Sequence, residues 1–226
     1  MEFKALIQSK ANNISDEAAK KFERYFELLT DWNTRLNLTA ITEAESVIEK
    51  HFLDSILPSK LIPKGSRCID IGTGAGFPGI PLAIIRPDIE MVLLDSLNKR
   101  VNFLNAVKNE LQIPLVCIHA RGEDAANDLK YREKFDVTLS RAVASINALT
   151  EVSVPYLKVG GVSVMLKGPK ANEELEQATD ALKALKASAQ VVNFDVPWGD
   201  RCAVVVRKEA PTPKGFPRKG MFKKPL

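Results

Sequence analysis

The chain is predicted to fold as an α/β protein built around a mostly parallel sheet. After residue 63, short apolar runs typical of strands alternate with helical patterns, as in βαβ units whose sheet is covered on both faces. A glycine-rich segment follows the first of these runs directly. The last two runs are joined by a short turn, which predicts that they pair in antiparallel fashion.

Residues 1–62 are expected to form a helical cap on this sheet. Ser15 precedes acidic residues and has the properties of an N-cap. A second helix is expected over 43–57, ended by Pro58, after a loop-like break at 37–40. The first helix is predicted from apolar residues at helical spacing, namely Phe22, Phe26, Leu29 and Leu36.

Residues 63–208 are expected to form the core. Its strands are predicted at 67–71, 91–95, 115–119, 135–140, 162–167, 190–196 and 202–207. Its helices are predicted at 80–85, 98–111, 125–129, 144–157 and 172–188. This alternation leaves only the last strand pair outside the βαβ pattern.

Residues 209–226 form a basic tail. The end of the chain sets seven basic residues against Glu209 alone, namely Arg207, Lys208, Lys214, Arg218, Lys219, Lys223 and Lys224. Phe216 and Phe222 are interleaved with them. Such a segment is typical of a phosphate-backbone contact, but a solvated and partly disordered tail fits the pattern equally well.

Composition predicts a cytoplasmic protein. Apolar residues make up 45% of the chain, but no apolar run approaches the ~20 residues needed to cross a bilayer, and the N-terminus lacks the apolar core of a secretion signal. Cys68, Cys117 and Cys202 lie far apart in apolar runs. This favours buried thiols in a reducing compartment over a disulfide or metal site.

The glycine-rich segment, residues 68–79, lies between the first predicted strand and the first helix of the core. Glycines there permit a tight turn and the close approach of a ligand to the backbone. The next predicted strand ends at Asp95, 23 residues after Gly72. A strand-end carboxylate at this spacing binds ribose hydroxyls in Rossmann units. The segment therefore predicts a site for a ribose-containing cofactor.

Two cofactors fit this segment. Gly74, Gly76 and Gly79 satisfy the G-x-G-x-x-G spacing of dinucleotide sites, so the pattern alone leaves that alternative open. Asp70, however, lies two positions before Gly72, and this arrangement is typical of class I methyltransferases. A carboxylate there suits the sulfonium and amino groups of S-adenosylmethionine and would repel a pyrophosphate. Asp70 therefore favours S-adenosylmethionine.

Five motifs occur along the chain in a specific order: NLTAI at 37–41, KHFLDS at 50–55, DIGTGAGFPGIP at 70–81, SRA at 140–142 and PRKG at 217–220. Together they resemble the RsmG (GidB) family of bacterial 16S rRNA guanine-N7 methyltransferases, from about Tyr25 to the C-terminus. The resemblance implies a Rossmann-like class I methyltransferase with a seven-stranded sheet and an antiparallel last strand. It also implies methyl transfer from S-adenosylmethionine to N7 of a guanine in the decoding-region loop of 16S rRNA.

The implied substrate is this rRNA, within the small ribosomal subunit or an assembly intermediate, and no membrane partner is expected. A monomer is the default oligomeric state. For the cofactor, the resemblance implies Gly72, Phe77, Gly122, Glu123 and Arg141. The glycine turn adds Asp70 and Gly74, and the Rossmann spacing adds Asp95. Candidate RNA-binding residues are Lys167, Arg201, Arg218, Lys219 and Lys223.

The chemistry requires no assigned catalytic base and no metal. Guanine N7 carries a lone pair and no proton, so methylation there does not depend on removing one. Arg141 follows the fourth strand at the ligand-binding end of the sheet and is a candidate for positioning the substrate. Phe77 is a candidate for a low-polarity wall near the methyl group. His51 and Asp54 lie one helical turn apart and receive no chemical role.

Three alternatives remain open from the residues. The first is a methyltransferase acting on a different RNA, a protein or a small molecule. The second is a nucleotide-dependent oxidoreductase that uses the dinucleotide spacing of the glycines. The third is an RNA-binding module that has kept the fold without activity. The basic, aromatic tail argues against a small-molecule acceptor.

Overall fold

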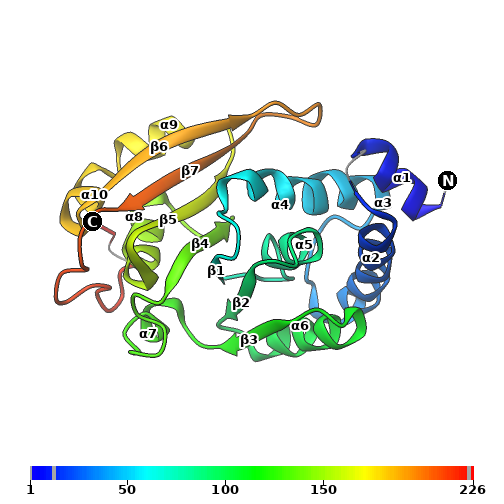
Figure 1. Ribbon diagram of the computed structural model, residues 1–226, viewed down its shortest axis with the longest axis horizontal. Coiled ribbons are helices and arrows are strands. Elements are labelled where there is room, and N and C mark those ends of the chain that lie inside the picture. The colour runs from blue at the N-terminus through cyan, green and yellow to red at the C-terminus, as the bar shows by residue number, and fades with distance from the viewer. Residues whose placement is uncertain (1, 12–13, 223–224) are drawn as a thin grey trace.

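The molecule is built on one seven-stranded sheet with the order β3-β2-β1-β4-β5-β7-β6 (Figure 1). The computed structural model describes residues 2–11, 14–222 and 225–226. Strands β1 to β5 pair in parallel, and β7 pairs antiparallel with both β5 and β6. The strands are β1 Arg67–Ile71, β2 Glu90–Asp95, β3 Leu115–His119, β4 Phe135–Arg141, β5 Leu157–Lys167, β6 Ala187–Phe194 and β7 Arg201–Lys208. The predicted fold class and the antiparallel last strand are confirmed.

Two apolar layers sandwich the sheet, because successive residues of each strand point to opposite faces. On one face, Cys68 and Leu93 pack with α5 (Gly79–Ile85), α6 (Asn98–Leu111) and the N-terminal helices. On the other face, Ile69 and Leu94 pack with a second group of helices: α7 (Gly122–Ala125), α8 (Ile146–Ser153) and α10 (Thr179–Leu185). None of the helices in the described part of the chain is both long and apolar enough to span a membrane.

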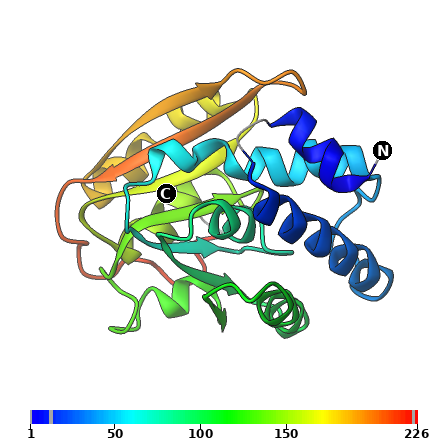
Figure 2. The ribbon, with the colours of Figure 1, turned by 45° about the vertical axis from the view of Figure 1, so that its right-hand side comes forward.

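The N-terminal residues are helical and pack against the core of the sheet, and we refer to them as the cap (Figure 2). Helix α1 spans Phe3–Lys10 and α2 spans Asp16–Leu36. The Ser15 hydroxyl accepts a hydrogen bond from the backbone N–H of Ala18 at 3.2 Å, which confirms the predicted N-cap. Phe22 and Tyr25 of α2 are completely buried. The cap is therefore continuous with the core of the sheet rather than a separate unit.

The second helix of the cap is not one regular helix. It consists of α3 (Ala44–Val47), a π-helical segment η1 (Ile48–Leu53), α4 (Asp54–Ile56) and a 3₁₀ segment η2 (Leu57–Leu61). The α-helical part ends at Ile56, next to the predicted end before Pro58, but the chain continues as the 3₁₀ segment η2, in whose first turn Pro58 lies. A proline there lacks only an N–H that has no partner within the helix.

Several boundaries in the core differ from the prediction. The helix expected at 144–157 is shorter, since α8 spans Ile146–Ser153. The helix expected at 125–129 is α7, which begins earlier at Gly122 and ends at Ala125. The helix expected at 172–188 is two helices, α9 (Ala171–Glu176) and α10, followed by β6 from Ala187. Strand β5 was expected at 162–167 but begins at Leu157, before its two glycines. A Cβ at Gly161 would lie 2.9 Å from the Asp136 carbonyl oxygen, so a glycine allows β5 to pass close to β4 there.

The described part of the basic tail, residues 209–222, packs against the core and returns the chain to α8 (Figure 1). Lys208 is completely buried, and its ammonium donates to Glu133 at 2.6 Å and to the Leu157 carbonyl at 2.8 Å. Glu151 of α8 is also completely buried and accepts from Arg218 Nε at 2.8 Å and Nη2 at 2.7 Å. One ion pair therefore fixes the end of β7, where the tail begins, and a second fastens the middle of the tail.

We expect the Arg218→Ala variant to lose on the order of 2–3 kcal/mol of unfolding free energy, because Glu151 then stays buried without its charged partner. Urea unfolding measures this loss. Lys219→Ala, which changes the exposed neighbour, is the control and should unfold like the wild type. An additional Glu151→Gln substitution should restore much of the loss. An Arg218→Ala protein that unfolds at the wild-type urea concentration would contradict this account.

Candidate active site

The glycine turn joins β1 to α5 at the carboxyl end of the parallel strands. The backbone N–H groups of Gly72 and Thr73 donate to the Leu94 carbonyl at 2.9 and 3.1 Å, so the turn is fastened to the end of β2. Gly74 has a φ of +63°, and no atom lies within 4 Å of the position a Cβ would occupy. At Gly76 a Cβ would lie 2.7 Å from the Tyr25 hydroxyl. Gly74 thus permits the left-handed backbone conformation and leaves open space beside the turn. Gly76 permits the cap to pack closely against the turn.

Asp70 lies at the base of this turn and is completely buried. Its Oδ2 accepts from the Thr73 hydroxyl at 2.6 Å and from the backbone N–H of Gly79 at 2.8 Å. Its Oδ1 makes no hydrogen bond within the described residues. Burial raises the pKa of Asp70 to about 6. A buried carboxylate with an unsatisfied oxygen fits a nearby cation, as the sulfonium and amino groups of S-adenosylmethionine would supply.

Asp95 links the end of β2 to the same turn. Its Oδ2 accepts from the backbone N–H of Gly74, and its Oδ1 accepts from that of Leu97, both at 2.9 Å. Oδ2 also lies 3.5 Å from Arg100 Nη1, whereas Oδ1 keeps a further lone pair, which fits a ribose hydroxyl of the cofactor. Leu97 was not predicted as a site residue. Its side chain is 52% exposed, and an exposed apolar side chain next to a ribose-binding carboxylate suits the adenine ring.

Gly122 and Glu123 begin α7 just after β3, whose last residue His119 pairs in register with Asp95. The carbonyl of Gly122 accepts from the Tyr156 hydroxyl at 2.6 Å. The predicted cofactor residues come from four separate segments. The fold brings them together at the carboxyl ends of the parallel strands, which we call the cofactor edge. Their contact with the cofactor stays a prediction.

Arg141 at the end of β4 connects this edge to the cap. Its guanidinium lies over the Phe77 ring, 4.8 Å from the centroid. It donates to the carbonyls of Lys50 at 3.1 Å and His51 at 3.4 Å. Both carbonyls belong to the π-helical segment η1, and such segments are frequent at functional sites. Phe77 itself is only 6% exposed, so Arg141 and His51 cover the ring proposed as a wall near the methyl group.

His51 supports Arg141 from the cap. Its ring stacks on Phe77 with centroids 4.7 Å apart, and its Nε2 lies 2.7 Å from the Thr39 hydroxyl. Burial, reinforced by the charge of Arg141, lowers the pKa of His51 to about 4. His51 is therefore a neutral, fixed ring near neutral pH. The sequence left it without a role because only the fold brings Arg141 and Phe77 to it.

A cavity of about 500 Å³ opens beside Arg141 at the ends of β4 and β5. Its apolar walls include Ile41, Leu57 and Leu166. Its charged lining consists of Lys50, Asp54, Arg141, Lys167, Glu174 and Arg201. A cavity of this size with a few polar groups is typical of a small-molecule or nucleobase site.

Asp54, the other residue left without a role, joins the cap to the β6–β7 hairpin. Its Oδ1 accepts from Trp198 Nε1 at 2.6 Å, and its Oδ2 accepts from Arg201 Nε at 2.8 Å. Lys167 is similarly engaged, since its ammonium donates to Glu174 at 2.6 Å and to the Ala144 carbonyl at 2.8 Å. Two of the predicted RNA-binding cations, Lys167 and Arg201, therefore line the cavity and are each paired with a carboxylate.

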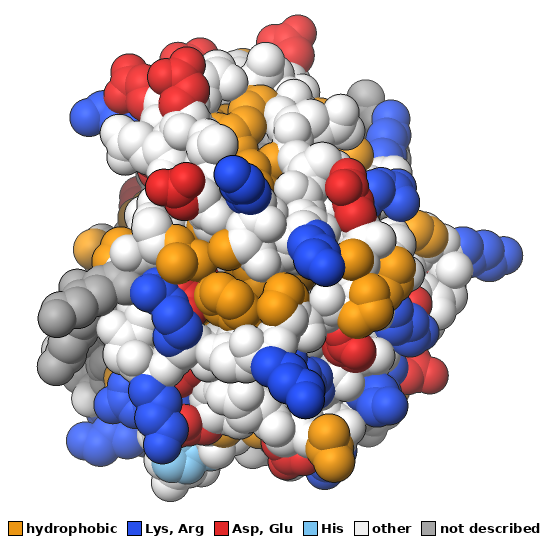
Figure 3. Space-filling model, turned by 90° about the vertical axis from the view of Figure 1, so that its left-hand side faces the viewer, with side chains coloured by type: hydrophobic (Ala, Val, Ile, Leu, Met, Phe, Trp, Pro, Cys, Tyr) orange, Lys and Arg blue, Asp and Glu red, His pale blue; other side chains and the backbone are white. Residues whose placement is uncertain are grey.

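The predicted RNA-binding residues do not form one cluster. Arg218 pairs with Glu151 on α8, Lys219 is exposed on the tail, and Lys223 lies outside the described residues. Figure 3 shows basic side chains scattered over the face that carries the tail rather than gathered into one patch. Across the described residues, no group of three or more His, Cys, Asp or Glu side chains is placed to hold a metal ion.

The model of the family described as rRNA small subunit methyltransferase G matches residues 18–197. The chain belongs to this family. A ribosomal RNA small subunit methyltransferase G from Lachnoclostridium phytofermentans is 46% identical over 220 residues, which cover 95% of this chain and 91% of that protein. Its counterpart from Streptococcus gordonii is 44% identical and covers 100% and 98%.

Solved structures support the fold of this methyltransferase family member. An O-methyltransferase from Bacillus cereus in complex with SAH has a TM-score of 0.58 at 16% identity and covers 82% of this chain and 91% of that one. The TYW2 protein from M. jannaschii in complex with AdoMet has a TM-score of 0.53 at 14% identity and covers 74% and 76%. Family membership identifies the chain as a methyltransferase, and the solved structures show that it shares a Rossmann-like methyltransferase fold.

We expect Asp70→Asn to weaken S-adenosylmethionine binding on the order of tenfold, because it removes the buried negative charge facing a cationic ligand. Titration calorimetry at about pH 7.5 measures this affinity. Glu90→Gln, an exposed carboxylate at the opposite end of β2, is the control and should bind normally.

The same variant tests the raised pKa of Asp70. Between the unfolded value near 3.8 and the folded value of about 6, the folded state binds a proton that the unfolded state does not. Without cofactor, the wild type should therefore gain thermal stability relative to Asp70→Asn as the pH falls from about 7.5 to about 5. A stability difference that does not change with pH would contradict the assignment.

Proposed function

We propose that this protein transfers the methyl group of S-adenosylmethionine to N7 of a guanine in the decoding-region loop of 16S rRNA. One observation carries the proposal: the cavity beside Arg141 adjoins the strand ends that hold the glycine turn and Asp95. A base in this cavity would lie next to a cofactor on β1 and β2. Membership of the rRNA small subunit methyltransferase G family supports rRNA as the acceptor.

The residues of the site are suited to orienting reactants rather than to moving a proton. Bound S-adenosylmethionine supplies an electrophilic methyl group on a cationic sulfur. Guanine N7 has a lone pair and no proton, so no side chain has to act as a base. Arg141, which lines the cavity, is held in a fixed stack with Phe77 and His51 beside the glycine turn. Orientation of this kind can contribute ~7–11 kcal/mol to the rate.

The proposed partner is 16S rRNA within the small ribosomal subunit or an assembly intermediate. The protein acts as a monomer in the cytoplasm, without a membrane partner. The cations around the cavity support an RNA substrate, because they outnumber the carboxylates that line it.

The first test is methyl transfer from labelled S-adenosylmethionine to small ribosomal subunits that lack the modification. Label should appear in one N7-methylguanine of 16S rRNA, identified by digestion and mass spectrometry. Asp70→Asn should lower the yield at limiting cofactor. A wild-type protein that binds S-adenosylmethionine yet labels no guanine would overturn the proposed acceptor and leave the fold and cofactor in place.

Lys50 is a better candidate for a phosphate contact than Lys167. It is exposed at the cavity, and within the described residues its ammonium makes no ion pair, whereas Lys167 already pairs with Glu174. We expect Lys50→Ala to reduce the slope of log affinity against log salt by about 0.7–0.9 in binding to small subunits. Lys64→Ala, an exposed lysine before β1 at the opposite end of the strands, should leave the slope unchanged. An unchanged slope in both variants would refute the contact.

A further inference from the structure

One wall of the cavity carries an anchored carboxylate. Glu174 of α9 lines the cavity, and its side chain is 33% exposed. Its Oε2 lies 2.6 Å from the Lys167 ammonium, which the Ala144 carbonyl also holds at 2.8 Å. Its Oε1 makes no hydrogen bond within the described residues. This carboxylate is fixed in place and can still accept hydrogen bonds.

The order of the strands places Glu174 on a definite side of a bound base. The cofactor residues lie at the ends of β1 and β2, Arg141 ends the next strand β4, and Lys167 ends β5 beyond it. A guanine that presents N7 to the methyl group directs its N2 amino group, which lies across the ring from N7, away from β1. The end of β5 and α9 lie on that side of the cavity. The N2–H₂ donor adjoins N1–H on the Watson–Crick edge of guanine, which pairs with cytosine in a duplex.

We propose that Glu174 recognises the Watson–Crick edge of the target guanine, with its carboxylate accepting hydrogen bonds from N1–H and N2–H₂. This inference rests on the proposed function. The second carboxylate of the cavity, Asp54, is less suited because both its oxygens already accept from Trp198 and Arg201. Lys167 holds the carboxylate in place, so it acts as a positioning residue.

The contact explains selection of guanine over adenine. Adenine presents an acceptor at N1 and no amino group at C2, so it would place a lone pair against the carboxylate and leave the free oxygen of Glu174 without a donor. The contact also requires a base whose Watson–Crick edge is unpaired. Such bases occur in loops and single strands, where sequence-specific RNA recognition is concentrated.

A merely structural role for Glu174 makes a different prediction. If Glu174 only holds Lys167, its removal should slow methylation of every substrate equally. If Glu174 recognises the base, its removal should slow methylation only of substrates that carry the hydrogen-bond donors it binds. The two roles therefore separate in a cycle that changes both the enzyme and the base.

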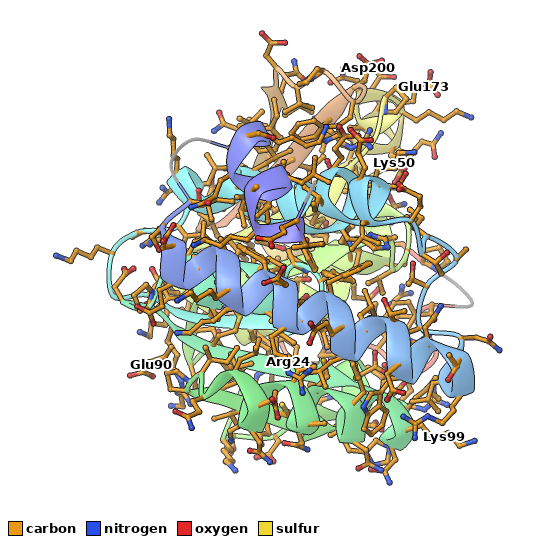
Figure 4. The ribbon with its side chains drawn as sticks, turned by 90° about the vertical axis from the view of Figure 1, so that its right-hand side faces the viewer. Arg24, Lys50, Glu90, Lys99, Glu173 and Asp200 are labelled. Atoms are coloured by element: carbon orange, nitrogen blue, oxygen red, sulfur yellow. The ribbon has the colours of Figure 1, made fainter. Side chains whose placement is uncertain are left out.

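The experiment uses small subunits reassembled with 16S rRNA that carries either guanosine or inosine at the target position. Inosine keeps N7, O6 and N1–H and lacks only the N2 amino group. For the wild type we expect kcat/KM to fall about 10- to 100-fold with inosine. For Glu174→Gln, which preserves shape, we expect a similar fall with guanosine and little further fall with inosine. Glu173→Gln, the exposed neighbour labelled in Figure 4, is the matched control and should behave like the wild type.

The affinity for S-adenosylmethionine, measured by calorimetry, should be unchanged in both variants, which also shows that they fold. The proposal is overturned if the wild type does not distinguish inosine from guanosine. It is equally overturned if Glu174→Gln keeps the full wild-type preference. A wild type that methylates neither subunit refutes the proposed function itself, which is a distinct result.

Discussion

The site depends on the position of the Arg141 guanidinium, which lies over Phe77 and is held by the carbonyls of Lys50 and His51. The arginine comes from the end of β4, the ring from the glycine turn, and the carbonyls from a π-helical segment of the cap. Lys50 and Arg141 are 91 positions apart in the chain. The Arg141 side chain therefore fastens the cap to the sheet. It also lies at the boundary between the cofactor edge and the cavity.

A second contact fastens the cap on the other side of the cavity. Asp54, one turn beyond Lys50, binds Trp198 and Arg201 of the β6–β7 hairpin. The cavity is thus enclosed by three segments that are distant in sequence and are joined by charged or aromatic groups. Because these groups are partly buried, their hydrogen bonds are directional and costly to break. The shape of the cavity is accordingly a property of the assembled fold and of no single segment.

This dependence explains which features the sequence predicted. The bounds of β1 and β3 match the prediction because both strands are short segments rich in apolar residues, and glycine or proline lies close to their ends. The glycine turn and Asp95 were recognised because their spacing is local. The ion-pair partners of Lys167 and Arg218, which are Glu174 and Glu151, were not predicted. No local pattern in the sequence marks these two glutamates as partners. The expected helix at 172–188 failed for a related reason, since its periodicity continues across the left-handed Lys186 that ends α10.

The charges of the cavity explain how a carboxylate can contribute to recognition of a polyanion. Four cationic side chains and two carboxylates line it. Each carboxylate is paired with a cation, Asp54 with Arg201 and Glu174 with Lys167. These pairs are nearly neutral at a distance, so the field that an approaching RNA meets is that of Lys50 and Arg141. At hydrogen-bond distance the paired carboxylates still act as acceptors. The same cavity can therefore attract phosphate from afar and favour the donors of guanine at contact.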